Sequence, residues 1–227
     1  QLLRRASTRF GIRAAMVNIA NYQAVFSRDA AMAGIIGYLL DDEKIMESWV
    51  ISTQNFRDTQ GKQGQIASNY IRSDEGYDHI SFGSLSPKID SCTWYLISIG
   101  LLIKKGKIEL EDYRKSILKT VNLLEGVEYN GKHLMYIPRG GNWADEYVYE
   151  GYILYDQLLR IWALELLSEP CDQPEWWDKA QRIRQTVIQN FYPTADRRDQ
   201  FLTAAFSPGV RFERFDLAAT CLFGLLF

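Results

Sequence analysis

The sequence predicts an all-α protein built from packed helical hairpins. Apolar residues recur at helical spacing in segment after segment, and no alternation of strands and helices accompanies them. Several expected helices are apolar almost all round, which indicates burial against neighbours on more than one side. A two-layer arrangement, in which outer helices cover inner ones, satisfies this pattern better than a four-helix bundle does.

Three successive helices are expected near the start of the chain, at 11–25, 29–40 and 42–56. Each shows helical apolar spacing. The acidic pair at 41–42 offers an N-cap to the third helix and places negative charge at the positive end of its dipole. The polar stretch at 57–88 has no sustained periodicity and is expected to be a long loop. Loops of that length usually serve a function.

Five further helices are expected, together with one small β-hairpin. The hairpin lies near 127–137, where an Asn-Gly turn separates two short apolar stretches. Pro174 suits the first turn of the helix that it begins. The five helical segments are 90–104, 110–125, 152–168, 174–191 and 213–227.

The composition is that of one globular domain. Hydrophobic residues make up 47% of the 227 residues, enough to bury a substantial core. The 26 basic and 28 acidic residues are nearly balanced and form no long run of like charge, which argues against a nucleic-acid partner. No apolar stretch has the length of a membrane span, so we expect a soluble, cytoplasmic protein without a membrane partner. Three widely spaced cysteines predict neither a disulfide framework nor a zinc site, and no cofactor is expected.

Three short motifs, each at the expected start of a helix, resemble those of a known enzyme class. They are Phe26-Ser27-Arg28-Asp29, the stretch PKIDSCTW at 87–94, and Trp143-Ala144-Asp145. In this order they resemble the six-hairpin (α/α)6 toroid glycoside hydrolases, notably neutral/alkaline invertases and the amylo-α-1,6-glucosidase domain of glycogen-debranching enzymes. The resemblance covers most of the chain. It implies a single toroid domain over 1–227, incomplete because fewer helices are expected than six hairpins need.

The resemblance also implies that Asp145 is the general acid of an inverting hydrolase of α-glucosidic bonds. Such a reaction needs one carboxylic acid to protonate the leaving oxygen and one carboxylate on the opposite face of the sugar. Trp143 and Tyr147 would desolvate Asp145 and raise its pKa, while Glu146 and Glu150 would oppose its ionisation. Glu146 is the alternative acid, and either residue would equally suit the cap of the following helix.

A carbohydrate substrate is the partner that the resemblance implies. Aromatic residues, 13% of the chain, suit the apolar faces of sugars but also fill helical cores. Arg28 and Asp29 would bind sugar hydroxyls, although an ion pair at a helix start fits the sequence equally well. Asp90 is either an N-cap or a sugar ligand. The substrate-binding residues so predicted are Phe26, Arg28, Asp29, Asn69, Tyr70, Asp90, Trp94, Trp143 and Tyr152.

The catalytic base is expected outside this chain, because in the family it comes from later hairpins. Glu213 and Asp216 are the late acids in a suggestive setting, and we expect neither to be the base. Missing hairpins would leave Leu and Phe side chains exposed over 213–227 and favour self-association. The alternative function is a non-hydrolytic carbohydrate protein: an epimerase, a lyase or a binding scaffold. An epimerase or lyase needs His or Tyr bases, and the two histidines, His79 and His133, have no partner at the spacing of a metal ligand set or a catalytic triad.

Overall fold

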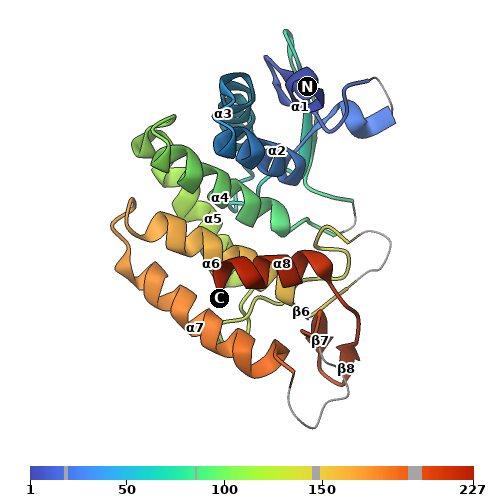
Figure 1. Ribbon diagram of the computed structural model, residues 1–227, viewed down its shortest axis with the longest axis vertical. Helices are drawn as coiled ribbons and strands as arrows, with labels where there is room; N and C mark the ends of the chain where they lie inside the picture. Colours follow the sequence, from blue (N-terminus) through green and yellow to red (C-terminus); the bar gives the residue numbers. More distant parts are fainter. Residues whose placement is uncertain (18–19, 85, 145–148, 194–200) are drawn as a thin grey trace.

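The computed structural model describes residues 1–17, 20–84, 86–144, 149–193 and 201–227, and within these ranges helices pack together with three small antiparallel sheets (Figure 1). The expectation of an all-α protein is therefore wrong, and the described helices do not show a toroid. The strands are two to six residues long. Strands that short leave too little alternation for a sequence pattern to reveal them.

Most expected helices are present, with boundaries shifted by a few residues. The segment at 11–25 is a clear error, because it contains two short strands and a 3-10 helix, Ala20–Gln23, in place of an α-helix. A second 3-10 turn, Leu110–Asp112, precedes the fifth helix. The α-helices are α1 Leu2–Ala6, α2 Ser27–Leu39, α3 Glu43–Asp58, α4 Asp90–Lys104, α5 Arg114–Gly126, α6 Leu154–Ser168, α7 Pro174–Phe191 and α8 Leu217–Leu226.

The strands lie at the ends of helices and connect segments that are distant in the sequence. The first sheet pairs β1 (Ser7–Thr8) with β2 (Gly11–Ile12), and the other two have the orders β3-β4-β5 and β6-β7-β8. Strand β3 runs directly into α2, and β6 runs directly into α6. The remaining bounds are β3 Val25–Phe26, β4 Asn69–Ser73, β5 Gly76–Ser81, β6 Tyr152–Ile153, β7 Ala205–Ser207 and β8 Val210–Phe212.

The structure differs from two expectations, the long loop at 57–88 and the β-hairpin near 127–137. The long loop expected at 57–88 holds the antiparallel pair β4 and β5. The hairpin expected near 127–137 does not form a strand pair: one backbone hydrogen bond joins Tyr136 N–H to the Val127 carbonyl, and Ile137 pairs with Gly151 instead. Pairing across the chain at Gly151 therefore replaces the local pairing that the Asn-Gly turn suggested.

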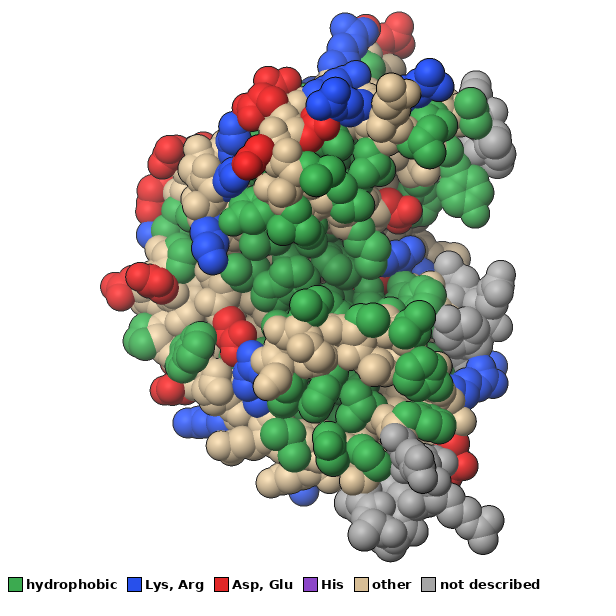
Figure 2. Space-filling model, in the orientation of Figure 1, with side chains coloured by type: hydrophobic (Ala, Val, Ile, Leu, Met, Phe, Trp, Pro, Cys, Tyr) green, Lys and Arg blue, Asp and Glu red, His purple; other side chains and the backbone are tan. Residues whose placement is uncertain are grey.

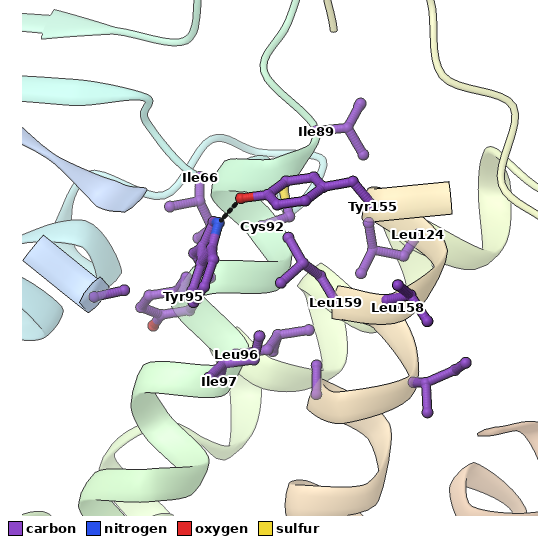
Figure 3. Close-up of a cluster of buried hydrophobic side chains, with 14 of the residues drawn as sticks. Ile66, Ile89, Cys92, Tyr95, Leu96, Ile97, Leu124, Tyr155, Leu158 and Leu159 are labelled. Carbon is purple, nitrogen blue, oxygen red and sulfur yellow. Dashed lines mark hydrogen bonds between the residues drawn. The ribbon is translucent and has the colours of Figure 1, made fainter. Parts of the chain in front are cut away.

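The core lies between α4 and α6, with α2 and α3 on one side and α7 on the other (Figure 1). Helix α4 is buried from its first residue through Leu102, as its all-round apolar sequence predicts. Figure 3 shows Tyr155 and Leu159 of α6 extending toward Cys92 and Leu96 of α4. These contacts fix the first turns of the two helices relative to each other.

Close packing of α2 on α3 depends on a glycine. A Cβ atom at Gly34 would lie 2.1 Å from Cδ2 of Trp49, which is buried. The indole Nε1 of Trp49 in turn donates a 3.1 Å hydrogen bond to Ser98 on α4. Gly34 thus lets a large ring fit between α2 and α3 and reach the central helix.

Helix α8 is apolar but only partly covered. Among its residues Ala219 and Leu222 are buried, whereas Leu217 and Leu225 are exposed, as is Phe227 after its end. In Figure 2 apolar side chains gather on the viewed face over α2, α4 and α8. The apolar exposure expected over 213–227 is therefore present. Within the described ranges no helix combines the length and the hydropathy needed to cross a membrane.

Candidate functional site

A small polar cavity lies where β3, β4 and the starts of α2 and α4 meet. Its volume is about 170 Å³. Phe26 lies directly opposite Asn69 in the β3–β4 register, and the chain continues from Phe26 into α2. This pairing brings together residues that lie far apart in the sequence. The lining residues are Phe26, Ser27, Arg28, Ser68, Asn69, Ser81, Gly83, Ser84, Lys88 and Ser91.

Arg28 connects the cavity to the buried start of α4. Its Nη1 donates a 2.9 Å hydrogen bond to Oδ2 of Asp90. Although burial lowers the pKa of Arg28, the charge of the adjacent Asp90 carboxylate raises it above its ordinary value. The ion pair that the sequence left open for Arg28 therefore forms with Asp90 across two helices. Asp29 instead lines a separate apolar groove beside the N-terminal segment.

Behind the cavity, buried carboxyl groups from three helices influence one another. Asp90 begins α4, Asp156 lies in the first turn of α6, and Asp216 caps α8 by accepting a 2.9 Å hydrogen bond from the Ala219 N–H. Burial raises the pKa of Asp156 well above its usual range, and repulsion from Asp90 and Asp216 adds to this. Burial also raises the pKa of Asp216. The protonated form of Asp156 is thus favoured in the fold.

The segment that precedes the predicted acid is held by side chains of α6 and of the residues before α4. Asn142 is buried, and its Nδ2 donates a 3.4 Å hydrogen bond to Oδ2 of Asp156. The Ala144 N–H donates to Oδ1 of Asn142 at 3.1 Å. Lys88 Nζ donates to the Asn142 carbonyl at 2.7 Å. These bonds fix the backbone of residues 142–144 against the cavity wall.

Asp145 and Glu146, the predicted general acid and its alternative, lie outside the described residues. Both roles stay predictions. Trp143 in the same motif packs its ring against Tyr155, with centroids 5.9 Å apart. The motif therefore contacts α6 through an aromatic pair in addition to the Asn142 bond.

The other predicted sugar ligands belong to packing contacts elsewhere. Tyr70 is fully buried, and its hydroxyl donates a 2.7 Å hydrogen bond to the Phe10 carbonyl. Trp94 is also buried and donates from Nε1 to the Tyr155 hydroxyl at 3.0 Å. Tyr152 accepts a 2.6 Å hydrogen bond from Asn130. The structure thus places Phe26, Arg28 and Asn69 in the cavity, with Asp90 behind Arg28, and none of these three aromatic residues lines it.

Sequence reasoning missed several polar residues of this site. Asp156 is one of the few charged residues in an otherwise apolar helix, and the helical spacing of 152–168 gave it no functional role. An acid in the first turn of a helix that is buried all round was the signal available. Ser27, Lys88 and Ser91 lay inside the quoted motifs, but their hydroxyl and ammonium groups have no role in the resemblance.

Comparison with known proteins gives no family assignment, because no family model matches the chain and a search of curated proteins finds no match. The chemistry of the site is therefore inferred from its own residues. An aromatic ring, a guanidinium, an amide and several hydroxyls around one cavity supply the kinds of contacts that a polyhydroxylated ring uses. In the part of the chain that the structure describes, no group of His, Cys, Asp and Glu side chains is arranged to hold a metal ion.

Proposed function

We propose that this protein is a glycoside hydrolase that cleaves α-glucosidic bonds of oligo- or polysaccharides by an inverting acid/base mechanism. The observation that supports the proposal best is the cavity that brings Phe26, Arg28 and Asn69 together. Phe26 and Arg28 belong to one motif of the resemblance, and Asn69 lies about forty positions later, outside the three motifs. Their convergence is what a carbohydrate site requires.

Each of the three side chains has a distinct part in the proposed binding. The Phe26 ring offers an apolar face to the C–H face of a sugar. Arg28 donates hydrogen bonds, and its ion pair with Asp90 holds the guanidinium in one orientation. The Asn69 amide can both donate and accept, as a hydroxyl partner must. Together they would hold one ring at the end of α2 that begins at Ser27.

In the proposed reaction Asp145 donates a proton to the leaving oxygen. The backbone just before it is fixed by Asn142, which in turn contacts Asp156. A fixed approach matters because a general acid must lie within hydrogen-bond reach of the atom that it protonates. Asp90 and Asp156 do not suit the role of base, since both are buried and a base must contact a water molecule.

Hydrolysis of α-glucosyl fluoride, followed by proton NMR, tests this function directly. An inverting enzyme releases β-glucose first, which then mutarotates. Sucrose and an α-1,6-linked oligosaccharide, assayed in parallel, test natural leaving groups. Release of α-glucose first would contradict the inverting mechanism. Because the base is expected outside these 227 residues, the assay uses the intact protein, and an intact, folded protein that turns over none of these substrates would contradict the hydrolase.

One observation favours a second function, a carbohydrate-binding protein without hydrolysis. The carboxyl groups described near the cavity are buried, and Asp90 is already paired with Arg28. Such a protein would bind a saccharide in the cavity and release it unchanged. Binding in calorimetry without turnover in the NMR assay would select this alternative.

A further inference from the structure

Lys88 connects the cavity to the loop that precedes the predicted acid. Its side chain lines the cavity, and its ammonium group donates a 2.7 Å hydrogen bond to the Asn142 carbonyl. We propose that Lys88 is a positioning residue of the reaction, because it holds the backbone before Asp145 in a fixed place relative to the sugar in the cavity. The inference rests on the proposed hydrolase function and adds a residue to which the resemblance assigns no role.

Two further donors just before α4 contact the same loop. The Ser86 hydroxyl donates a hydrogen bond to the Arg139 carbonyl, and the Ile89 N–H donates to the Gly141 carbonyl at 2.7 Å. Lys88 lies between these two donors in the sequence, and its bond supplies another contact. Because several hydrogen bonds join these two short segments, the loop cannot shift away from the start of α4 without breaking more than one of them.

The loop turns sharply, and its glycines allow this. Gly140 has a positive φ of 71°, which glycine adopts without steric cost. A Cβ atom at Gly141 would lie 2.8 Å from the Pro138 carbonyl oxygen, and the Gly141 N–H donates a 2.8 Å hydrogen bond to that same oxygen. The loop is thus a tight turn, and the carbonyl groups that follow Pro138 accept the hydrogen bonds from the segment before α4.

Lys88 can hold the loop because its own backbone is fixed. The Lys88 N–H donates a 3.1 Å hydrogen bond to the Phe82 carbonyl, and the next residue, Ile89, is buried. Asp90 then begins α4 and accepts the hydrogen bond from Arg28. The ammonium group therefore extends from a part of the chain that is joined to the other side of the cavity.

The Lys88 bond acts on the main chain of Asn142, while the side chain of Asn142 contacts α6. Asp156 accepts a hydrogen bond from Nδ2 of Asn142, and the Ala144 N–H donates to its Oδ1. Without the ammonium group, α6 would still hold this side chain, but the link to the cavity wall would be weaker. A displacement of about 1 Å can lower a rate by about 10²-fold. We therefore expect Lys88 to determine the position of the acid more than the affinity for the sugar.

Lys88→Met tests the inference in the intact protein, because methionine keeps much of the apolar stem and lacks the ammonium group. We expect kcat for sucrose or an α-1,6-linked oligosaccharide to fall by about 10–10²-fold, with KM changed by less than about threefold. Hydrolysis of α-glucosyl fluoride should be largely spared, since its leaving group needs little protonation. A merely structural role would affect both kinds of substrate alike. Lys88→Arg, whose guanidinium can donate to the same carbonyl, should recover part of the loss.

Hydrogen–deuterium exchange of the intact protein gives a second readout, which does not depend on activity. The amides of 139–144 should exchange several-fold faster in Lys88→Met than in the parent protein, because the loop opens more often. The matched control is Lys107→Met, which removes a 2.6 Å lysine bond to Glu43 beyond the other end of α4. It should match the parent protein in both exchange and turnover. Thermal unfolding of each variant confirms that it is folded.

Two results would overturn the inference. One is unchanged exchange at 139–144 in Lys88→Met. The other is an equal effect on natural glucosides and on α-glucosyl fluoride, which would make Lys88 a sugar ligand or a residue without a part in the reaction. With an active parent protein, either result leaves the proposed hydrolase intact. A parent protein that turns over none of the substrates would refute the hydrolase and with it the role of Lys88 in the reaction, whatever the exchange shows.

Discussion

Arg28 and Asp90, which are 62 positions apart, are joined by a 2.9 Å hydrogen bond between Nη1 and Oδ2. Asp90 is 1% exposed at its side chain, whereas Arg28 is 27% exposed and reaches the cavity. The carboxylate therefore fixes one edge of the guanidinium, while the side chain lines the cavity. The same bond joins the first turn of α2 to the first turn of α4. It therefore holds the part of α2 that lines the cavity against the buried start of α4.

Asp145→Asn should separate the general-acid role from substrate binding. The amide keeps the shape of the carboxyl but has no transferable proton, so turnover of natural α-glucosides should fall by about 10²–10⁴-fold. Hydrolysis of α-glucosyl fluoride should be largely spared, because fluoride needs little protonation to leave. Steady-state kinetics with both substrates measure the difference.

Glu146→Gln is the control for this experiment. A mere neighbour of the acid should lose far less activity than Asp145→Asn. The opposite pattern would make Glu146 the acid. Full activity in both variants would mean that the loop serves only as a helix start.

Asp156→Asn should raise stability at neutral pH and leave it unchanged near pH 4. Burial raises the pKa of Asp156 in the fold, while in the unfolded chain it is about 3.9. As pH rises above that value, the unfolded chain loses the proton and the fold retains it. The free energy of unfolding of the parent protein then falls by up to about 1.4 kcal/mol per pH unit until the folded pKa is passed. Asparagine cannot ionise, so this fall in the free energy of unfolding does not occur in the variant.

Thermal unfolding between pH 4 and pH 8 measures the effect of Asp156→Asn. Asp178→Asn on the exposed face of α7 is the control and should follow the parent protein. An equal loss of stability in Asp156→Asn at both ends of the pH range would show that the ionised carboxylate is needed.

Arg160→Ala should destabilise the fold by about 1.5–3 kcal/mol, because it removes a hydrogen bond to the buried Glu128 carboxylate, which keeps Lys179 at 2.8 Å. Arg160 is 1% exposed, and its Nη1 donates a 2.8 Å hydrogen bond to Oε2 of Glu128 on the segment after α5. Urea denaturation measures the loss. Arg9→Ala removes a fully surface-exposed pair with Asp74 and should change stability by less than about 1 kcal/mol. Equal losses of stability in Arg160→Ala and Arg9→Ala would show that burial does not strengthen the contribution of Arg160.

Gly34→Ala should destabilise the packing of α2 on α3 by about 1–3 kcal/mol or more, since the new methyl group would overlap the Trp49 ring. Gly126→Ala at the end of α5 meets open space and should stabilise by about 0.4–1 kcal/mol through the unfolded state. Melting temperatures of the two variants should therefore move in opposite directions. A neutral Gly34→Ala variant would mean that Trp49 can shift.

Self-association is expected through the exposed apolar side chains of α8. Leu225 is 79% exposed, and Leu217 and Phe227 are exposed near it in the sequence. Sedimentation velocity should show association that rises with concentration and weakens in Leu225→Lys. Leu118→Lys on α5 is the control at another exposed leucine. A parent protein that stays monomeric at all concentrations would contradict the expectation.

Long helices were predictable because apolar periodicity persists over several turns, as in α4 and α6. The strands were not, because β3 and β6 have two residues each and β4 lies in a polar stretch. Their pairing depends on partners more than forty positions away, as between Phe26 and Asn69. Local patterns carry no information about such pairing.

The site was predictable in part for the same reason. Phe26 and Arg28, from one motif, and Asn69, outside the motifs, could be selected from the sequence, but their meeting in one cavity depends on the β3–β4 register. Asp156 could not be separated from ordinary polar positions, because its unusual pKa arises from burial among side chains of other helices. Tyr70 looked like a ligand and is a core residue, since aromatic rings serve both purposes.

The pairing of β3 with β4 has a consequence for how this cavity can change. Phe26 and Asn69 are placed opposite each other by the backbone register of two strands, and backbone hydrogen bonds do not depend on which side chain either position carries. Either side chain can thus be exchanged without moving the other, provided that the strands stay paired. Single substitutions at these two positions can therefore change the chemistry of the cavity, in evolution or in the laboratory, while the paired strands preserve its shape.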